Sequence, residues 1–314
     1  MPRVCHLAIA PVSLFLLTAI ACEPESSMPT RDTSNPPVAD IHPTELTTHG
    51  VTRVDDYYWL RERENPEVIA YLEAENEDTA RAMAHSEGLQ TELFNEIKDR
   101  IKPDDSSVPF RDGEYFYYTR YEEEMEYPIH ARKFGSPDAG EEIMLNANEL
   151  AAGHDFFSIG GRQVTEDGRL LAYGVDTGGR RFYTIHFKDL TTGEMLPDVI
   201  PDVTGNMVWA NDNRTLFYVK QDPGTLRSYQ LFRHMLGTDP AQDQLVYEET
   251  DTEFSIGVGR SKSDDFLILG INQTLSTEFH ILDANDPTGE FEVVLPREPN
   301  HEYMVDHVGE DLYI

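Results

Sequence analysis

Hydrolysis by a serine nucleophile would need that serine in a tight Gly-x-Ser-x-Gly turn, because larger flanking side chains do not fit the bend. The 314-residue sequence contains no such string. The nearest is residues 259–263 (GRSKS), in which Ser263 stands at the second glycine position. We therefore interpret Ser261 as part of a turn between strands. We predict no catalytic residue in this sequence, and we expect the polypeptide by itself to be inactive.

Metal-binding and phosphate-binding patterns are equally weak. The eleven histidines are scattered singly, without a His-x-x-x-His pair or a cysteine partner, so zinc has no ligand set. Residues 283–289 (DANDPTG) resemble the start of a calcium loop, but Pro287 cannot supply a side-chain ligand and Val294 stands where the bidentate glutamate belongs. Gly178 and Gly179 lie between two predicted strands rather than before a helix. We predict turns at both places, and no metal or cofactor.

The charge balance restricts the possible partners. With 58 acidic and 25 basic residues, the formal net charge is −33, and such a surface repels phosphate backbones. Nucleic acid is therefore excluded as a partner, whereas short basic peptides would be attracted. The acidic run at residues 122–126 (EEEME) could steer a cationic substrate, but we predict an exposed hairpin tip there.

The N-terminus has the pattern of an export signal. Residues 7–21 form an apolar run too short for a membrane-spanning helix, and it ends in Ala19-Ile20-Ala21-Cys22. This ending resembles the lipobox of bacterial lipoproteins, with Ala19 where leucine is more common. We predict a signal peptide at residues 1–21 and acylation of Cys22, which makes the protein periplasmic or anchored to a membrane. The alternative is a plain export signal with an incidental cysteine.

The mature chain is predicted to have three parts. Residues 22–50 are rich in Pro, Ser and Thr and are expected to form a disordered tether. Residues 51–104 are expected to hold two helices, the first beginning at Pro66 and running to Met83, the second spanning Leu89 to Ile101 with an apolar stripe. Residues 105–314 contain only short runs of aromatic and β-branched residues between turns, which is typical of strands. With Cys5 removed, no internal disulfide can form.

The strand-like runs repeat. An Asp-Gly, Asp-Asn, Asp-Asp or Gly-Glu turn precedes an apolar run every 45–55 residues, and a second apolar run follows about twenty residues later. The turns are at residues 112, 167, 212, 264 and 309. Two runs in each repeat of about fifty residues predict four-stranded propeller blades, each stabilised by its neighbours. We therefore predict an all-β fold, an incomplete β-propeller of about four blades and the start of a fifth. A sandwich with coincidental spacing is the alternative.

Several segments resemble the prolyl oligopeptidase family of serine peptidases, and most closely its oligopeptidase B branch. They are residues 56–61 (DYYWLR), 65–68 (NPEV), 71–76 (YLEAEN), 98–132, 153–161 (GHDFFSIGG), 167–194, 208–222 and 286–309. The resemblance implies a seven-bladed propeller joined to a C-terminal hydrolase domain with a Ser, Asp, His triad. It also implies that the N-terminal helices pack on that domain, that the propeller admits short peptides and excludes folded proteins, and that cleavage follows Arg or Lys.

No position of this sequence matches the family's catalytic residues, so none is assigned. The favoured interpretation is the N-terminal and propeller part of such an oligopeptidase, whose hydrolase domain is its partner. The first alternative is a stand-alone propeller lipoprotein that serves in binding or as a scaffold. The second alternative is a prolyl oligopeptidase with post-proline specificity.

Overall fold

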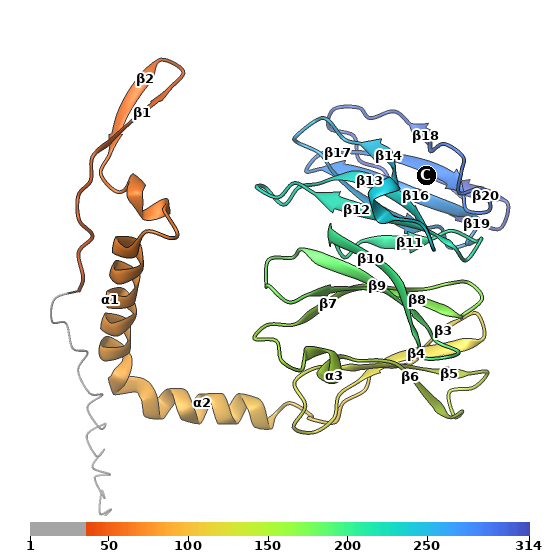
Figure 1. Cartoon of the computed structure of the whole chain (residues 1–314), viewed down its shortest axis with the longest axis horizontal. Helices are drawn as coiled ribbons and strands as arrows, with labels where there is room; N and C mark the ends of the chain where they lie inside the picture. Colours follow the sequence, from red (N-terminus) through yellow and green to blue (C-terminus); the bar gives the residue numbers. More distant parts are fainter. Residues whose placement is uncertain (1–35) are drawn as a thin grey trace, which may run out of the picture. The chain divides into compact units, whose positions relative to one another are not determined.

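The computed structural model describes residues 36–314, which form two units: the chain up to Ile101, and Lys102–Ile314 (Figure 1). The predicted signal peptide, Cys22 and the first part of the predicted tether lie outside the described residues. No helix in the described part is both long and apolar enough to cross a membrane.

The first unit begins with a β-hairpin that the sequence analysis missed. Strand β1 (Thr44–Thr48) pairs antiparallel with β2 (Val51–Asp55) through a turn at His49 and Gly50, which have φ of 52° and 79°. Two consecutive residues with positive φ match the right-handed twist of the paired strands. The predicted disordered tether, residues 22–50, was therefore wrong for residues 44–50. β-Branched threonines and a glycine turn favour a hairpin in this polar segment.

Two helices follow the hairpin, as predicted. After the 3-10 turn η1 (Tyr58–Arg61), α1 spans Pro66–Met83, and the side chain of Asn65 accepts a hydrogen bond from the backbone N–H of Glu67 (2.9 Å). This cap and a proline at the first helical position fix the start of α1. A turn η2 (Ala84–Ser86) leads into α2 (Glu87–Asp99), two residues ahead of the predicted bounds at both ends.

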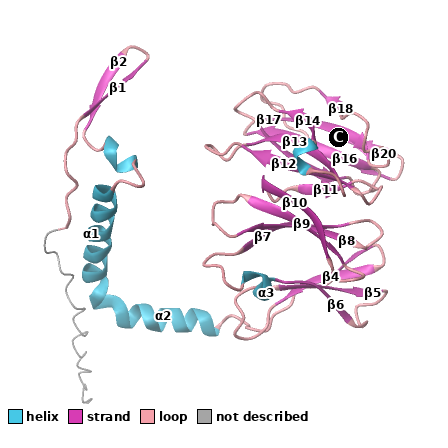
Figure 2. Cartoon of the chain, viewed as in Figure 1, coloured by secondary structure: helices cyan, strands magenta, loops and turns pink. Residues whose placement is uncertain are grey.

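The second unit consists of four antiparallel four-stranded sheets and a two-stranded fifth. Figure 2 shows the first and second of these sheets as two layers, with the strands of the other sheets grouped beyond the second. In every sheet the strands lie in chain order, each hydrogen-bonded to the next. The first sheet holds β3 (Phe110–Asp112), β4 (Tyr115–Arg120), β5 (Ile129–Phe134) and β6 (Glu141–Asn146); the second β7 (Ser158–Val164), β8 (Leu170–Asp176), β9 (Tyr183–Asp189) and β10 (Met195–Val203); the third β11 (Met207–Trp209), β12 (Thr215–Gln221), β13 (Ser228–Met235) and β14 (Gln244–Glu248); the fourth β15 (Ser255–Arg260), β16 (Phe266–Gln273), β17 (Ser276–Asp283) and β18 (Glu292–Leu295); the fifth β19 (Asp306–Val308) and β20 (Asp311–Tyr313). Two short helical segments, α3 (Ala147–Ala151) and η3 (Pro240–Gln242), interrupt the loops.

This arrangement confirms the predicted propeller of four blades and the start of a fifth. In each of the four complete sheets the first predicted apolar run is the second strand, and the second predicted run is the third strand. The predicted turns at residues 112, 167, 212 and 264 all join the first strand of a sheet to its second. Each sheet is therefore one unit of the sequence repeat.

The core lies between the sheets. Three apolar clusters occupy the three spaces between successive complete sheets. Between the second and third sheets, Phe187 and Ile200 pack on Trp209 and Tyr218, all at most 2% exposed. Because a single sheet leaves both faces apolar, each blade is stabilised only by its neighbours.

Candidate functional site

Three acidic turns meet at one opening in the second unit. The β3–β4 turn, the β7–β8 turn and the end of β15 with its following turn line a cavity of about 430 Å³. We call this cavity the channel mouth. Its charged lining residues are five carboxylates and one guanidinium: Asp112, Glu114, Glu166, Asp167, Asp264 and Arg260. Since the turns come from three different sheets, the first strands of these sheets face one common space.

The local structure of the turns holds the mouth in shape. Asp167 accepts hydrogen bonds from Thr165 Oγ1 (2.6 Å) and from the backbone N–H of Arg169 (3.0 Å), which stabilises the β7–β8 turn. The guanidinium of buried Arg132, on β5, pairs with Glu142 at 2.7 and 2.9 Å and donates to the carbonyl of Gly168. The first sheet thereby fixes the turn of the second.

Three of the mouth carboxylates are free of partners. Within the described part of the chain, no hydrogen bond or ion pair joins the side chain of Asp112, Glu114 or Glu166 to another residue, and all three residues are exposed. Asp264 lies 3.5 Å from the guanidinium of Arg260. The mouth therefore has an excess of negative charge that neighbouring groups do not neutralise, which attracts cations.

The serine string at residues 259–263 runs from the end of β15 into the turn before β16, and Ser261 begins that turn, as predicted. Ser261 is 2% exposed, and its Oγ accepts a hydrogen bond from the backbone N–H of Phe266 (3.1 Å). Ser263 Oγ lies 2.7 Å from Nδ1 of His307, and Asp265 Oδ2 lies 3.5 Å from the same nitrogen. A catalytic triad places the serine and the carboxylate on opposite ring nitrogens, so this group cannot relay a proton from the serine.

The other predicted turns are confirmed. In the segment at residues 283–289, Asp286 accepts hydrogen bonds from the N–H and Oγ1 of Thr288. Asp176 accepts from the N–H groups of Gly178 and Gly179 between β8 and β9. The acidic run at 122–126 lies between β4 and β5, at the tip of a hairpin. Among the described residues, no group of three or more His, Cys, Asp or Glu could hold a metal ion.

A buried histidine between the second and third sheets was not predicted. His234 on β13 is fully buried, with Nδ1 2.8 Å from Asp243 Oδ1 and Nε2 3.1 Å from Asp198 Oδ1. Tyr218 donates its hydroxyl proton to the other oxygen of Asp243 (2.9 Å), and Phe187 packs against the ring. Both ring nitrogens can donate only when the imidazole is protonated. This cluster therefore holds a charged histidine between two carboxylates.

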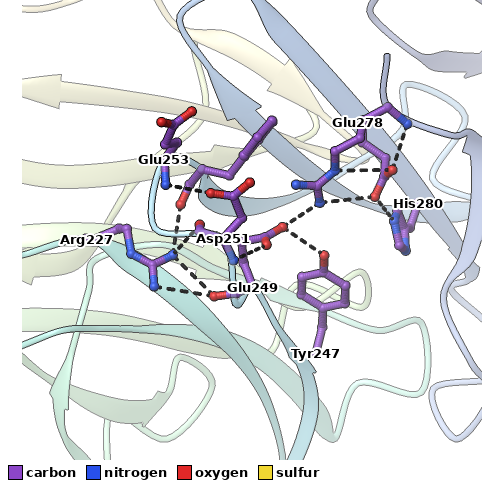
Figure 3. A network of polar contacts seen from close by, with 9 residues as sticks. Arg227, Tyr247, Glu249, Asp251, Glu253, Glu278 and His280 are labelled. Carbon is purple, nitrogen blue, oxygen red and sulfur yellow. Dashed lines mark hydrogen bonds and ion pairs between the residues drawn. The ribbon is translucent and has the colours of Figure 1, made fainter. Parts of the chain in front are cut away.

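A second polar network, shown in Figure 3, connects the third and fourth sheets. Arg297 pairs with Glu249 (2.5 Å) and Glu278 (3.4 Å), both at most 9% exposed, and the hydroxyl of Tyr247 donates to Glu249 (3.1 Å). Burial and the charge of Glu249 raise the pKa of Tyr247 to about 12. Burial raises the pKa of Glu278, but hydrogen bonds from His280 and Arg297 outweigh it and leave the pKa below its usual value. These groups are paired with one another, so the network joins sheets rather than forming an open site.

Comparison with known proteins identifies the family. A family model for the prolyl oligopeptidase N-terminal β-propeller domain matches residues 36–314. Dipeptidyl aminopeptidase BI of Pseudoxanthomonas mexicana is 43% identical over 96% of this chain and 44% of its own length. Protease 2 of Moraxella lacunata is 37% identical over 87% of this chain and 40% of its own.

A solved structure agrees with these relatives. Oligopeptidase B from Leishmania major superposes with a TM-score of 0.81 at 29% identity, over 88% of this chain and 42% of that one. The chain thus spans less than half the length of the proteins it matches. The sheets, their order and the family match lead to one conclusion: the chain belongs to the prolyl oligopeptidase family of peptidases, through its N-terminal β-propeller domain.

Proposed function

We propose that this chain is the access domain of an oligopeptidase B-like serine peptidase, which admits short basic peptides to a hydrolase domain that cleaves after Arg or Lys. The observation that supports the substrate class is the channel mouth, where three turns place five carboxylates around an opening of about 430 Å³. A negative opening raises the local concentration of cationic peptides and the rate at which they enter. In this proposal the exposed apolar residues of α1 and α2, among them Leu72, Leu93 and Ile97, pack on the hydrolase domain.

The mouth is tested by removing its two unpaired glutamates. For the double variant Glu114→Gln/Glu166→Gln of the whole protein, we expect kcat/KM for an Arg-containing short peptide to fall about two- to fivefold at low salt, because part of the steering field is lost. The loss should shrink as ionic strength rises, since salt screens exposed charges beyond about 10 Å at 0.1 M. A neutral peptide should be cleaved at an unchanged rate.

The matched control is Glu123→Gln/Glu124→Gln, which removes two charges at the β4–β5 hairpin tip instead of the mouth. This control should leave kcat/KM unchanged. An equal loss in both double variants, or a loss that does not depend on salt, would count against steering at the mouth.

We further propose that the protein is exported and anchored to a membrane through acylated Cys22. Replacing Cys22 by alanine is expected to release the protein into the soluble fraction or to block its processing, because the described chain offers no helix that could hold it in the bilayer. Fractionation and immunoblotting measure this, with Cys5→Ala as the control that should behave as wild type. If the Cys22→Ala protein stays in the membrane fraction as wild type does, acylation of Cys22 is not what anchors it, and the lipobox interpretation is wrong.

A further inference from the structure

A second cavity lies between the first and second sheets and adjoins the channel mouth. Its volume is about 300 Å³, and its floor includes the buried side chains of Tyr117, Met144 and Leu171. Tyr117 and the exposed Asp112 line both this cavity and the mouth. A hollow with an apolar floor and a few polar groups is the usual form of a site for a small ligand.

The cavity contains a guanidinium that a neutral histidine holds. Nη1 of Arg162, on β7, lies 2.8 Å from Nε2 of His130. A guanidinium can only donate, so Nε2 is the acceptor and the ring proton is on Nδ1, which donates to Thr119 Oγ1 (3.0 Å). Burial and the charge of Arg162 lower the pKa of His130 to about 4. His130 therefore orients Arg162 without neutralising its charge.

The charge of Arg162 has no counter-ion in the described part of the chain. No carboxylate oxygen there lies within 4 Å of its guanidinium, and His130 is its only hydrogen-bond partner. Arg162 is exposed as a residue, but partial desolvation of its guanidinium in the cavity lowers its pKa. Four of its five N–H groups stay available, and a guanidinium binds a carboxylate through two parallel hydrogen bonds. Asp112 also forms no ion pair with the described residues, so the cavity has one free group of each sign.

We propose that this cavity binds the free C-terminal carboxylate of a short peptide, with Arg162 receiving the carboxylate and the last side chain of the peptide packing on the apolar floor. The inference that the ligand is a peptide rests on the proposed function. The inference that it carries a carboxylate rests on the unpaired guanidinium of Arg162. A zwitterionic peptide also matches the charges of Arg162 and Asp112. Inorganic phosphate could meet the same guanidinium, but it would leave the apolar floor uncovered.

The test is calorimetric titration of the whole protein with glycyl-phenylalanine and with its C-terminal amide. We expect the acid to bind about tenfold or more tightly than the amide, because hydrogen bonds to a charged group are stronger than those to a neutral one. Arg162→Gln should abolish this difference. The matched control Arg214→Gln, at an exposed arginine in the β11–β12 turn, should keep it. If the Gln variant does not fold, Arg162→Lys is used instead. It keeps the positive charge but cannot form two parallel hydrogen bonds, so it should reduce the difference in affinity between the acid and the amide.

Several results would overturn the proposal: equal affinities for acid and amide, no binding of either, or an undiminished difference in the folded Arg162 variant. Displacement of the dipeptide by phosphate at equal concentration would also overturn it, in favour of a general anion site. Hydrolysis of an Arg-containing peptide is measured in parallel. Carboxylate-dependent binding without hydrolysis would contradict the proposed peptidase activity and support the carboxylate site. Hydrolysis without such binding would support the peptidase activity and contradict the carboxylate site.

Discussion

Replacing Asp243 by alanine is expected to lower the free energy of unfolding of the propeller unit by about 3–5 kcal/mol, the usual effect of breaking a buried ion pair. The change leaves the protonated ring of His234 with only Asp198, and it leaves the hydroxyl of Tyr218 without an acceptor. The bond from His234 to Asp198, which joins β13 to β10 of the second sheet, remains, but the charged ring is then supported by one carboxylate instead of two. Urea denaturation followed by circular dichroism measures the loss. Asp243→Asn keeps an acceptor and should cost less.

The same cluster should make stability depend on pH. Burial alone would lower the pKa of His234, but the hydrogen bonds and charges of Asp243 and Asp198 outweigh it and raise the pKa above 6.5. A group with a raised pKa in the folded state stabilises fully below its unfolded pKa, and that stabilisation is lost as pH rises through the folded value. The stability difference between wild type and His234→Gln should therefore shrink as pH rises above about 6.5. A difference that stays constant into alkaline pH would show that His234 is not charged in the fold.

Gly161→Ala is expected to have the second large effect. Gly161 has φ of +64° at a bulge in β7, and a Cβ there would overlap the carbonyl oxygen of Gly205, in the segment that leads into β11. The left-handed backbone costs a non-glycine residue about 1–2 kcal/mol, and the overlap adds about 1–3 kcal/mol, so we expect a loss of roughly 2–5 kcal/mol.

The control for this prediction is Gly140→Ala. Gly140 does not have a positive φ, and a Cβ there would meet no atom within 4 Å, so its unfolding curve should match that of wild type. If Gly161→Ala unfolds at the same urea concentration as Gly140→Ala, the close contact between the second and third sheets does not exist in solution.

The repeat of the sheets was predictable because it depends on local chemistry. Apolar runs such as Leu216–Val219 follow turn residues directly, and a strand after a tight turn pairs with the strand before it. The N-terminal hairpin was missed because β1 and β2 have little apolar alternation, and only the glycine turn at residue 50 marks them. The start of α1 was predictable from Asn65 and Pro66, which act within one turn of helix.

The polar groups between sheets could not be predicted from the sequence. Asp198 precedes its partner His234 by 36 residues, and His130 and Arg162 are 32 residues apart. The alternation of side chains along a strand shows on which face of its sheet a residue lies. It does not show which residue of the neighbouring sheet that side chain meets. Isolated histidines were therefore interpreted as core or surface residues, and only the packing of the sheets distinguishes the charged His234 from the neutral His130.

We propose that this propeller gives short peptides, and not folded proteins, access to a peptidase. The most direct measurement compares hydrolysis by the whole protein of a short Arg-containing peptide and of a folded protein with the same sequence in a surface loop. We expect cleavage after Arg in the free peptide, and intact folded protein after the same incubation. Cleavage of both at similar rates would contradict the access role. No cleavage of the peptide by the whole protein would contradict the peptidase and favour the stand-alone binding propeller.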